Sequence, residues 1–233
     1  MAKMKFLCDS ERCIECNGCV TACKNANETE WGIQRRRVVT LDDGEPTETS
    51  ISVACMHCTD APCMAVCPTD CFYQTDDGIV LHDKDLCIGC GYCLFACPFG
   101  APQFPTEGAF GERGKMDKCT FCAGGPEDDP IVEKEKYGAN RIAEGKLPLC
   151  AEMCSTKALL AGDAQVVSDI FRERVVYRGH KDGAWSSLEG GAAAPGGSAP
   201  GEMSQEEMAA RAEAFATDAA LASNNTNGII AKA

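Results

Sequence analysis

The chain has 233 residues, a formal net charge of −13 and 18 cysteines, against three histidines and two tryptophans. Aromatic residues make up only 6 % of it, so we expect bound metal, rather than a large apolar core, to hold the fold together. The acidic charge argues against nucleic acid as a partner, because phosphate binding requires a basic face. No apolar run reaches about 18 residues, and the N-terminus has no apolar signal-peptide core. A membrane span or an export signal is therefore expected only on a partner.

The first cysteine block, CIECNGCVTAC, has the spacing C-x2-C-x2-C-x3-C and contains Cys13, Cys16, Cys19 and Cys23. Disulfide partners need Cα atoms about 4.4–6.8 Å apart with converging side chains, and these thiols compete for the same short loops. Structural zinc sites usually take their cysteines in pairs separated by a longer spacer. The 2-2-3 run is typical of bacterial ferredoxins, in which the fourth thiolate binds a second cluster. The spacing therefore favours iron–sulfur ligation over a disulfide or a zinc site.

A strand is predicted for RRRVVTL, which lies directly before Asp42. Its arginines Arg35, Arg36 and Arg37 fit two interpretations equally well, a contact with a partner or alternating positions on a solvated strand face. The second cysteine block follows, CMHCTDAPCMAVCP, with the spacing C-x2-C-x4-C-x3-C. It contains Cys55, Cys58, Cys63 and Cys67.

The segment CFYQTDDGIVLHD predicts a hairpin, because short β-rich runs flank Asp77-Gly78, a two-residue turn signal. The third block, CIGCGYCLFACP, returns to the 2-2-3 spacing with Cys87, Cys90, Cys93 and Cys97. Pro68 and Pro98 follow the last cysteines of blocks two and three, as in the ferredoxin pattern, whereas Lys24 and Ser155 hold those positions in blocks one and four. Blocks two and three therefore match the pattern best.

The fourth block is split between CTFC and CAEMC and contains Cys119, Cys122, Cys150 and Cys154. After it, ALLAG predicts a short buried strand, and AQVVSDIFRERVVYR predicts an amphipathic helix with Asp163 as its N-cap.

From Ser186 the composition is that of a flexible linker. Beyond the linker, Ser204 and Glu207 form a capping-box pair for a segment that is either a solvated tail or a docking helix. Its apolar face would comprise Met208, Ala212, Phe215 and Ala219.

The four blocks use every cysteine except Cys8 and Cys71. A lone cysteine usually behaves as a small buried hydrophobe, and we expect this of both. His57, inside block two, is expected to be structural. The sequence shows no nucleophile–base pair and no phosphate-binding loop, so we expect no catalytic residue. Soft thiolate ligands in these numbers point to electron transfer through iron–sulfur clusters.

The four blocks resemble the four-cluster iron–sulfur subunits of molybdenum and tungsten oxidoreductases. The segments SERCIECNGCVTACKNANE, CIGCGYCLFACPFGAPQF and GKMDKCTFCAGG are most similar to the beta subunit of respiratory-type formate dehydrogenases. The resemblance covers about residues 1–180. It implies an α+β fold of two ferredoxin-like modules, each with two 4Fe–4S clusters, and a flexible C-terminal tail. One electron-transfer domain would span 1–185, with blocks two and three forming the module 50–105, and the linker and tail would span 186–233.

By motif position, the resemblance implies four cluster sites. The first site comprises Cys13, Cys16, Cys19 and Cys154, and the second comprises Cys23, Cys119, Cys122 and Cys150. The third comprises Cys55, Cys58, Cys63 and Cys97, and the fourth comprises Cys67, Cys87, Cys90 and Cys93. In similar nitrate reductase subunits, tryptophan at the position of Cys90 leaves a three-iron cluster, so the cysteine here implies a four-iron cluster.

The implied partners are a catalytic alpha subunit with molybdenum or tungsten held by bis-pterin, and a cytochrome b membrane subunit. Membrane-bound family members end in a transmembrane helix, whereas this chain ends in a polar, Ala/Gly-rich tail. Folded export with the catalytic subunit's twin-arginine signal is expected, which implies a periplasmic location, with the cytoplasm as the alternative. Two other functions stay open, the same role beside a different reductase or hydrogenase, and a free soluble polyferredoxin. Identification of a co-purified large subunit would separate them.

Overall fold

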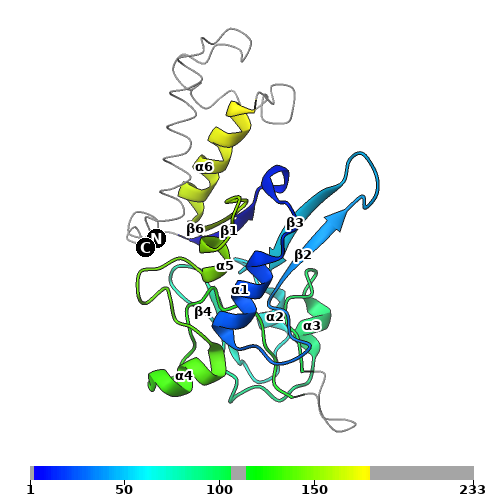
Figure 1. Cartoon of the computed structure of the whole chain (residues 1–233). Helices are drawn as coiled ribbons and strands as arrows, with labels where there is room; N and C mark the ends of the chain where they lie inside the picture. Colours follow the sequence, from blue (N-terminus) through cyan, green and yellow to red (C-terminus); the bar gives the residue numbers. More distant parts are fainter. Residues whose placement is uncertain (1–2, 106–113, 179–233) are drawn as a thin grey trace.

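The computed structural model describes residues 3–105 and 114–178. Its elements are β1 (Met4–Cys8), η1 (Ser10–Arg12), α1 (Gly18–Asn27), β2 (Arg36–Leu41), β3 (Thr49–Ala54), α2 (Pro62–Ala65), β4 (Phe72–Gln74), β5 (Val80–His82), α3 (Tyr92–Ala96), α4 (Pro130–Tyr137), α5 (Leu149–Glu152), β6 (Leu159–Asp163) and α6 (Ala164–Tyr177). The strands pair as three separate antiparallel ribbons, β1–β6, β2–β3 and β4–β5 (Figure 1). The fold is thus mixed α/β, with long loops between short elements. The linker and tail expected over 186–233 lie outside the described residues, as does their predicted helix.

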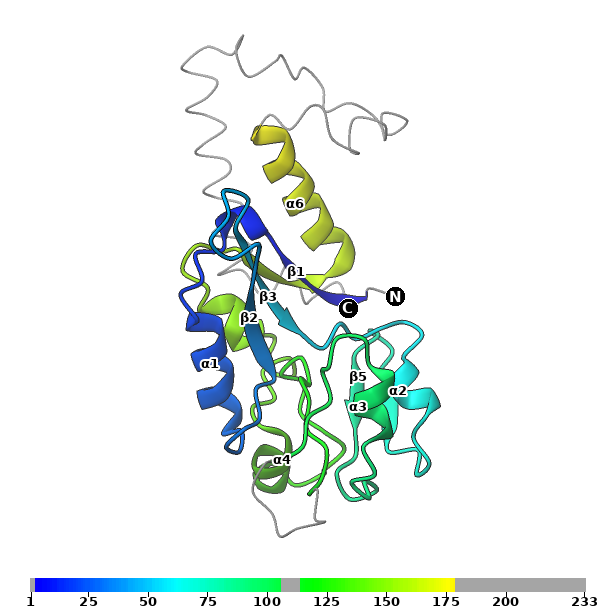
Figure 2. The same cartoon turned by 90° about the vertical axis from the view of Figure 1, so that its right-hand side faces the viewer.

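The first ribbon joins the two ends of the described chain, because β1 pairs with β6. The predicted strand ALLAG is confirmed as β6, and its five residues are all buried. Asp163 ends this strand and caps α6 by accepting hydrogen bonds from the backbone N–H groups of Gln165 and Val166, as predicted. Helix α6 then lies beside the ribbon and contacts both of its strands (Figure 2). Val167 of α6 packs with Leu160 of β6 in a small apolar cluster.

The second ribbon confirms the predicted strand before Asp42 and changes the interpretation of its arginines. Arg35 and Arg36 are buried and Arg37 is half-buried, so the solvated strand face proposed for them is wrong. Arg35 forms a bidentate ion pair with the buried Asp117, at 2.5 Å from Nε to Oδ1 and 2.9 Å from Nη2 to Oδ2. Strand alternation alone could not predict this, because Asp117 lies 82 residues away from Arg35 in the sequence.

The third ribbon is the predicted hairpin, with Phe72 opposite His82. Its connection is longer than the two-residue turn that Asp77-Gly78 indicated. Thr75 donates its backbone N–H to the carbonyl of Ile79 at 2.9 Å, which closes a loop of residues 75–79. Gly78 has a φ of +80° in this loop, a conformation that favours glycine.

Four of the helices repeat one relationship with the cysteine blocks. The third cysteine of each block is the second residue of a helix, and the fourth follows it by four residues. These helices and cysteines are α1 with Cys19 and Cys23, α2 with Cys63 and Cys67, α3 with Cys93 and Cys97, and α5 with Cys150 and Cys154. In α1 both cysteines lie within the helix, on the same side of one turn. In α2, α3 and α5 the fourth cysteine lies one or two residues beyond the last helical residue, so the two thiols of each pair are close along the chain.

Cysteines form much of the core. The largest buried cluster combines Cys19, Cys23, Cys150 and Cys154 with apolar residues that include Met4 and Phe121. With so few aromatic side chains to bury, thiols occupy positions that hydrophobes hold in most domains. Across residues 3–105 and 114–178, no helix combines the length and the apolar character needed to cross a bilayer.

Candidate iron–sulfur sites

The C-x2-C segment that opens each block has one backbone feature in common. In each, the residue before the second cysteine has a positive φ. These residues are Glu15 at 56°, His57 at 45°, Gly89 at 71° and Phe121 at 60°. Turns that include such left-handed residues can direct successive N–H groups to one side and bind anions, including iron–sulfur clusters. Three of the four residues are not glycine, so the conformation costs some backbone strain. Its recurrence shows that the cysteine repeat is also a structural repeat.

A second loop recurs after the fourth cysteine of blocks two, three and four. The third residue beyond the cysteine has a positive φ, at Asp70, Gly100 and Lys157. The turn directs a backbone N–H back to the cysteine sulfur. The donors are Cys71 to Cys67 at 3.4 Å, Ala101 to Cys97 at 3.5 Å and Leu159 to Cys154 at 3.4 Å. Such N–H···S hydrogen bonds stabilise a thiolate and tune the potential of a cluster that it holds.

The predicted third site surrounds a small pocket that is partly open to solvent. Its lining includes all four cysteines of that site, Cys55, Cys58, Cys63 and Cys97. Pro98 and Lys118 complete part of the wall. Lys118 is 1 % exposed and donates hydrogen bonds to the carbonyl oxygens of Val80 and Cys119. Burial raises the pKa of Cys63 to about 11, and the Lys118 charge acts in the opposite direction. A fixed cation thus lies beside this set of thiols.

The predicted fourth site surrounds a small pocket that is partly open to solvent. It is lined by Cys67, Cys87, Cys90 and Cys93, and also by a fifth cysteine, Cys71. Hydrogen bonding to Cys71 lowers the pKa of Cys87 to about 5, whereas the pKa of Cys71 itself is raised. Cys71 is buried, as expected of it. Its place beside the predicted ligands went unnoticed in the sequence, because a single cysteine outside the repeat carries no signal of where its loop will lie.

The second site lies in the core. Cys23, Cys119, Cys122 and Cys150 are all buried. Burial raises the pKa of Cys23, and the charges of Cys150, Cys119 and Cys122 raise it further, in that order. The predicted members of the site are therefore electrostatic neighbours. The backbone N–H of Phe121 donates to the sulfur of Cys119 at 3.4 Å.

The first site joins the two ends of the cysteine repeat. Helix α1 packs against α5, which brings Cys13 and Cys19 into one apolar cluster with Cys154. The sulfur of Cys16 lies 3.9 Å from the hydroxyl oxygen of Ser155, the residue after Cys154. A side chain at Gly18 would lie 3.6 Å from the Cys16 sulfur. Cys16 is exposed, as is Cys90 of the fourth site, whereas the second site is wholly buried.

These donor sets fit iron–sulfur clusters better than single ions. Within the described residues, no three Cys, His, Asp or Glu side chains converge on one point as the ligands of one metal ion would. Zinc holds four ligands about 2.3 Å from one centre, whereas the thiolates of a 4Fe–4S cluster bind separate irons at its corners and stand further apart. The N–H···S hydrogen bonds and the thiol-only donor sets both suit the larger group.

His57 has the structural role that we expected. It is 1 % exposed, and its Nδ1 accepts a hydrogen bond from the backbone N–H of Val80 at 3.1 Å. Burial, and then the nearby charges of Lys118 and Lys5, lower its pKa well below the usual value. His57 therefore stays neutral and holds the block-two loop against β5. Cys8 is half-buried on β1, and its sulfur accepts from the backbone N–H of Ser52 at 3.2 Å.

Comparison with known proteins identifies the family. Residues 47–164 match the model of the 4Fe-4S dicluster domain. The chain is 66 % identical over 180 residues to the formate dehydrogenase iron-sulfur subunit of Wolinella succinogenes, which covers 76 % of this chain and 90 % of that protein. It is 35 % identical over 168 residues to the probable anaerobic dimethyl sulfoxide reductase chain YnfG of Escherichia coli, covering 67 % and 72 % of the two chains. It is also 35 % identical over 183 residues to the thiosulfate reductase electron transfer subunit PhsB of Salmonella typhi, covering 74 % and 83 %. The repeated cysteine loops and these similarities together show that the chain is a ferredoxin-like iron–sulfur protein and belongs to the 4Fe-4S dicluster family that includes the iron–sulfur subunits of formate dehydrogenases.

Proposed function

We propose that the chain is the electron-transfer subunit of a formate dehydrogenase complex. It would pass electrons from a molybdenum or tungsten catalytic subunit to a cytochrome b, a quinone or another acceptor. The observation that carries this proposal is the 66 % identity to the Wolinella succinogenes subunit over 90 % of that protein. The relatives named for dimethyl sulfoxide and thiosulfate reductases share only 35 % identity, and they favour the same role beside another catalytic subunit as the second candidate.

Four 4Fe–4S clusters would occupy the four sites, each held by the four cysteines assigned to it above. A 4Fe–4S cluster, when bound, accepts and releases one electron. The chain's own residues would supply the thiolate ligands, the inward N–H groups that stabilise negative charge, and the burial that keeps water away. Blocks one and four would form one ferredoxin-like module, and blocks two and three the other.

The helices suggest the order of the sites along the electron path. Cys19 of the first site and Cys23 of the second lie on the same turn of α1. In the same way, Cys63 of the third site lies in α2, and Cys67 of the fourth follows shortly after the end of that helix. Cys119 of the second site and Cys55 of the third belong to one buried cluster. The proposed order is therefore first, second, third and fourth.

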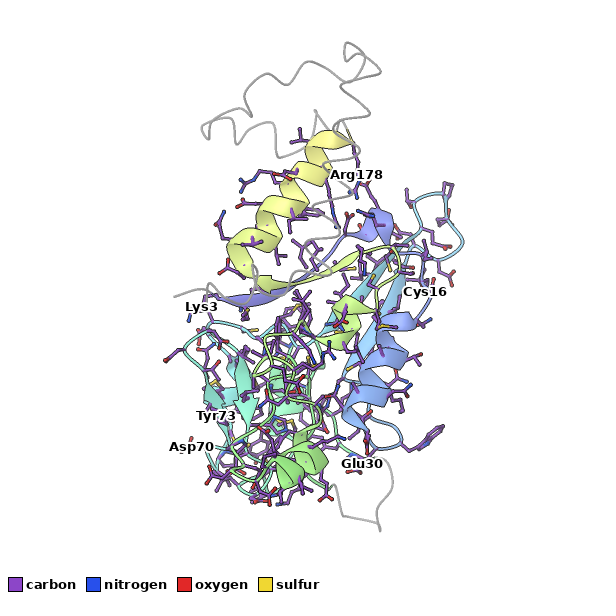
Figure 3. All side chains as sticks on the ribbon, turned by 60° about the vertical axis from the view of Figure 1, so that its left-hand side comes forward. Lys3, Cys16, Glu30, Asp70, Tyr73 and Arg178 are labelled. Atoms are coloured by element: carbon purple, nitrogen blue, oxygen red, sulfur yellow. The ribbon has the colours of Figure 1, made fainter. Side chains whose placement is uncertain are left out.

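The two ends of this proposed path lie on opposite sides of the molecule. Figure 3 shows Cys16, in the first site, far from Asp70, in the loop that follows Cys67 of the fourth site. Figure 2 likewise separates α1 from α2 and α3. Cys16 and Cys90 are the exposed cysteines of the two end sites, which suits exchange of electrons with a partner at either end. We place the fourth site at the acceptor end and the complex on the periplasmic side of the membrane.

The test is to purify the intact complex anaerobically, identify its large subunit and measure its metals. We expect about 16 irons for each copy of this chain, molybdenum or tungsten on the partner, and bleaching of the cluster absorbance when formate is added. A complex bleached by dithionite but not by formate, and reoxidised by dimethyl sulfoxide or thiosulfate, would favour the second candidate. Stoichiometric zinc without visible absorbance would contradict the cluster sites themselves.

The order of the sites needs a variant that affects the acceptor end alone. Cys93→Ser removes a buried fourth-site thiol. We expect it to slow electron delivery from formate to a quinone, while formate oxidation with an artificial dye that takes electrons near the catalytic subunit survives. Equal loss in both assays, with the complex intact, would contradict the proposed order.

A further inference from the structure

Arg36 is a buried cation without a full set of hydrogen-bond partners. It lies on β2 and is 1 % exposed. Its Nη1 donates to the hydroxyl oxygen of Ser52 at 3.0 Å, but its Nε and Nη2 have no hydrogen-bond partner within the described parts of the chain. The neighbouring Arg35 is almost as deeply buried, yet it has Asp117 as a bidentate partner. The two adjacent arginines therefore differ in how their charge is balanced.

The surroundings of Arg36 are aromatic on one side and thiol-rich on the other. Its Cζ lies 4.3 Å from the ring centroid of Phe6, and that ring lies 4.3 Å from the ring of Phe121, inside the second-site C-x2-C loop. Burial lowers the pKa of Arg36, but nearby thiols raise it by more, so the net shift is upward. Those thiols are Cys150, Cys119, Cys23 and Cys19. Three of the four belong to the second site.

Arg36 also reaches the first site through one hydroxyl. The oxygen of Ser52 that accepts from Arg36 lies 3.3 Å from the sulfur of Cys19. Cys19 belongs to the first site and Cys23 to the second, one turn apart on α1. The guanidinium is therefore next to the second site and one hydroxyl away from the first.

A buried guanidinium is costly unless an anion compensates it. Among the described residues, no carboxylate supplies that charge to the Nε and Nη2 of Arg36. A cluster held by four thiolates is anionic and becomes more negative on reduction. A cation fixed beside a cluster stabilises the reduced form more than the oxidised form, which raises the reduction potential. Low dielectric strengthens the effect, because Arg36 and the second-site thiols are shielded from water.

We propose that Arg36 is the counter-charge shared by the first and second sites and that it raises the reduction potential of both, the second more than the first. The inference rests on the ligand sets of the proposed function. It gives the β2–β3 ribbon a role beyond packing, because the ribbon positions one charge between two neighbouring sites. The third site has a separate buried cation, Lys118, on its own wall.

The test is a redox titration of the intact complex, followed by electron paramagnetic resonance, with Arg36→Gln. The signal of each site is assigned by the variant that removes one of its ligands. We expect the second-site midpoint potential to become more negative, the first-site potential to follow by a smaller shift, and the third- and fourth-site potentials to stay in place. Iron content should remain that of the wild type. Arg172→Gln, which removes the same charge from an exposed position on α6, should move none of the four.

Three outcomes would overturn the inference. One is unchanged first- and second-site potentials in Arg36→Gln with full iron content. Another is an equal shift at all four sites, which a general loosening of the fold would produce. If Arg36→Gln does not load iron, the test uses Arg36→Lys, which keeps the positive charge. Arg36→Lys should keep the first- and second-site potentials close to those of the wild type. A marked negative shift of these potentials in Arg36→Lys is the third outcome that would overturn the inference. A wild-type chain without iron would instead refute the cluster sites of the proposed function. Failure of the proposed function can therefore be told apart from failure of the inference about Arg36.

Discussion

The sulfur of Cys71 lies 3.4 Å from the sulfur of Cys67, so a thiol outside the cysteine repeat is within hydrogen-bond distance of a predicted ligand. Although partial burial acts to raise the pKa of Cys67, hydrogen bonds from Cys71 and Thr69 lower it. The backbone N–H of Cys71, which donates to the Cys67 sulfur at 3.4 Å, favours the thiolate at Cys67. Cys71 therefore also lies where it could replace Cys67 as a ligand.

The first prediction follows from this short distance. Cys67→Ser should keep most of the fourth-site iron, because Cys71 lines the same pocket and can take over as ligand. Cys67→Ser/Cys71→Ser should lose about four irons per chain. Iron and sulfide analysis of the anaerobic complex measures both, with Cys71→Ser alone as the control that retains the wild-type count. Equal iron loss in the single Cys67 variant and the double variant would show that Cys71 does not replace it.

The second prediction concerns removal of the metal. Cys19, Cys23 and Cys150 lie in the largest core cluster. Because the metal links these thiols, loss of iron would leave them packed against each other in the core without their bonds to the cluster. We expect oxidative removal of iron to abolish most of the cooperative unfolding transition, monitored by far-UV circular dichroism during a urea titration. Truncation after Gly190 should leave iron content unchanged. Persistence of a cooperative transition in the iron-free chain would show that the apolar contacts suffice.

The third prediction concerns the buried ion pair. Asp117 binds Arg35 at 2.5 Å and Lys84 at 3.1 Å. Asp117→Asn leaves the Arg35 charge buried without its anion, which should cost about 3–5 kcal/mol of unfolding free energy. The urea midpoint of cluster bleaching in the intact complex measures the loss. Asp85→Asn is the matched control, because Asp85 pairs with Lys136 at an exposed position and its removal should leave the midpoint close to that of the wild type.

The fourth prediction is a pH dependence that arises at His82. This side chain is fully buried, and neither ring nitrogen has a hydrogen-bond partner in the described residues. Burial, and then the charge of Lys118, lower its pKa well below 6.5. As the pH falls through about 6.5, the unfolded chain binds a proton here and the folded chain does not, so stability falls. The stability is retained above that pH.

His82→Phe isolates this contribution, because a phenyl ring can pack edge-on against Tyr137 as the imidazole does at 5.5 Å. Urea midpoints at about pH 7.5 and about pH 6 should differ less in the variant than in the wild type. An identical pH dependence in both proteins would assign the effect to other groups, such as His57.

The cysteine repeat predicted a recurring loop, and the structure confirms that recurrence. The spacing favours iron–sulfur ligation over a disulfide or a zinc site. In the structure, a residue with a positive φ precedes each of Cys16, Cys58, Cys90 and Cys122, so the same local turn recurs in all four blocks. Local periodicity likewise predicted β6, its cap Asp163 and α6. These features depend on neighbours in the sequence.

Three features were missed, one that depends on distant segments and two that depend on local turns. Arg36 is buried against Phe6 of β1 and Ser52 of β3, with thiols of blocks one and four nearby. The position of Cys71 depends on a turn that returns to the sulfur of Cys67. The hairpin loop was predicted too short because Thr75, rather than Asp77, closes it through Ile79. In each case the deciding contact joins residues that no short pattern connects.

The pairing of the third and fourth cysteines, four residues apart in each block, has a consequence for maturation. Under the proposed ligand sets, the two thiols of each pair belong to different sites, so each of these four short segments links two neighbouring metal centres. Filling one site would fix the segment and orient the waiting ligand of the next. Cluster insertion would then proceed cooperatively from site to site, and partly loaded chains would be scarce during biosynthesis.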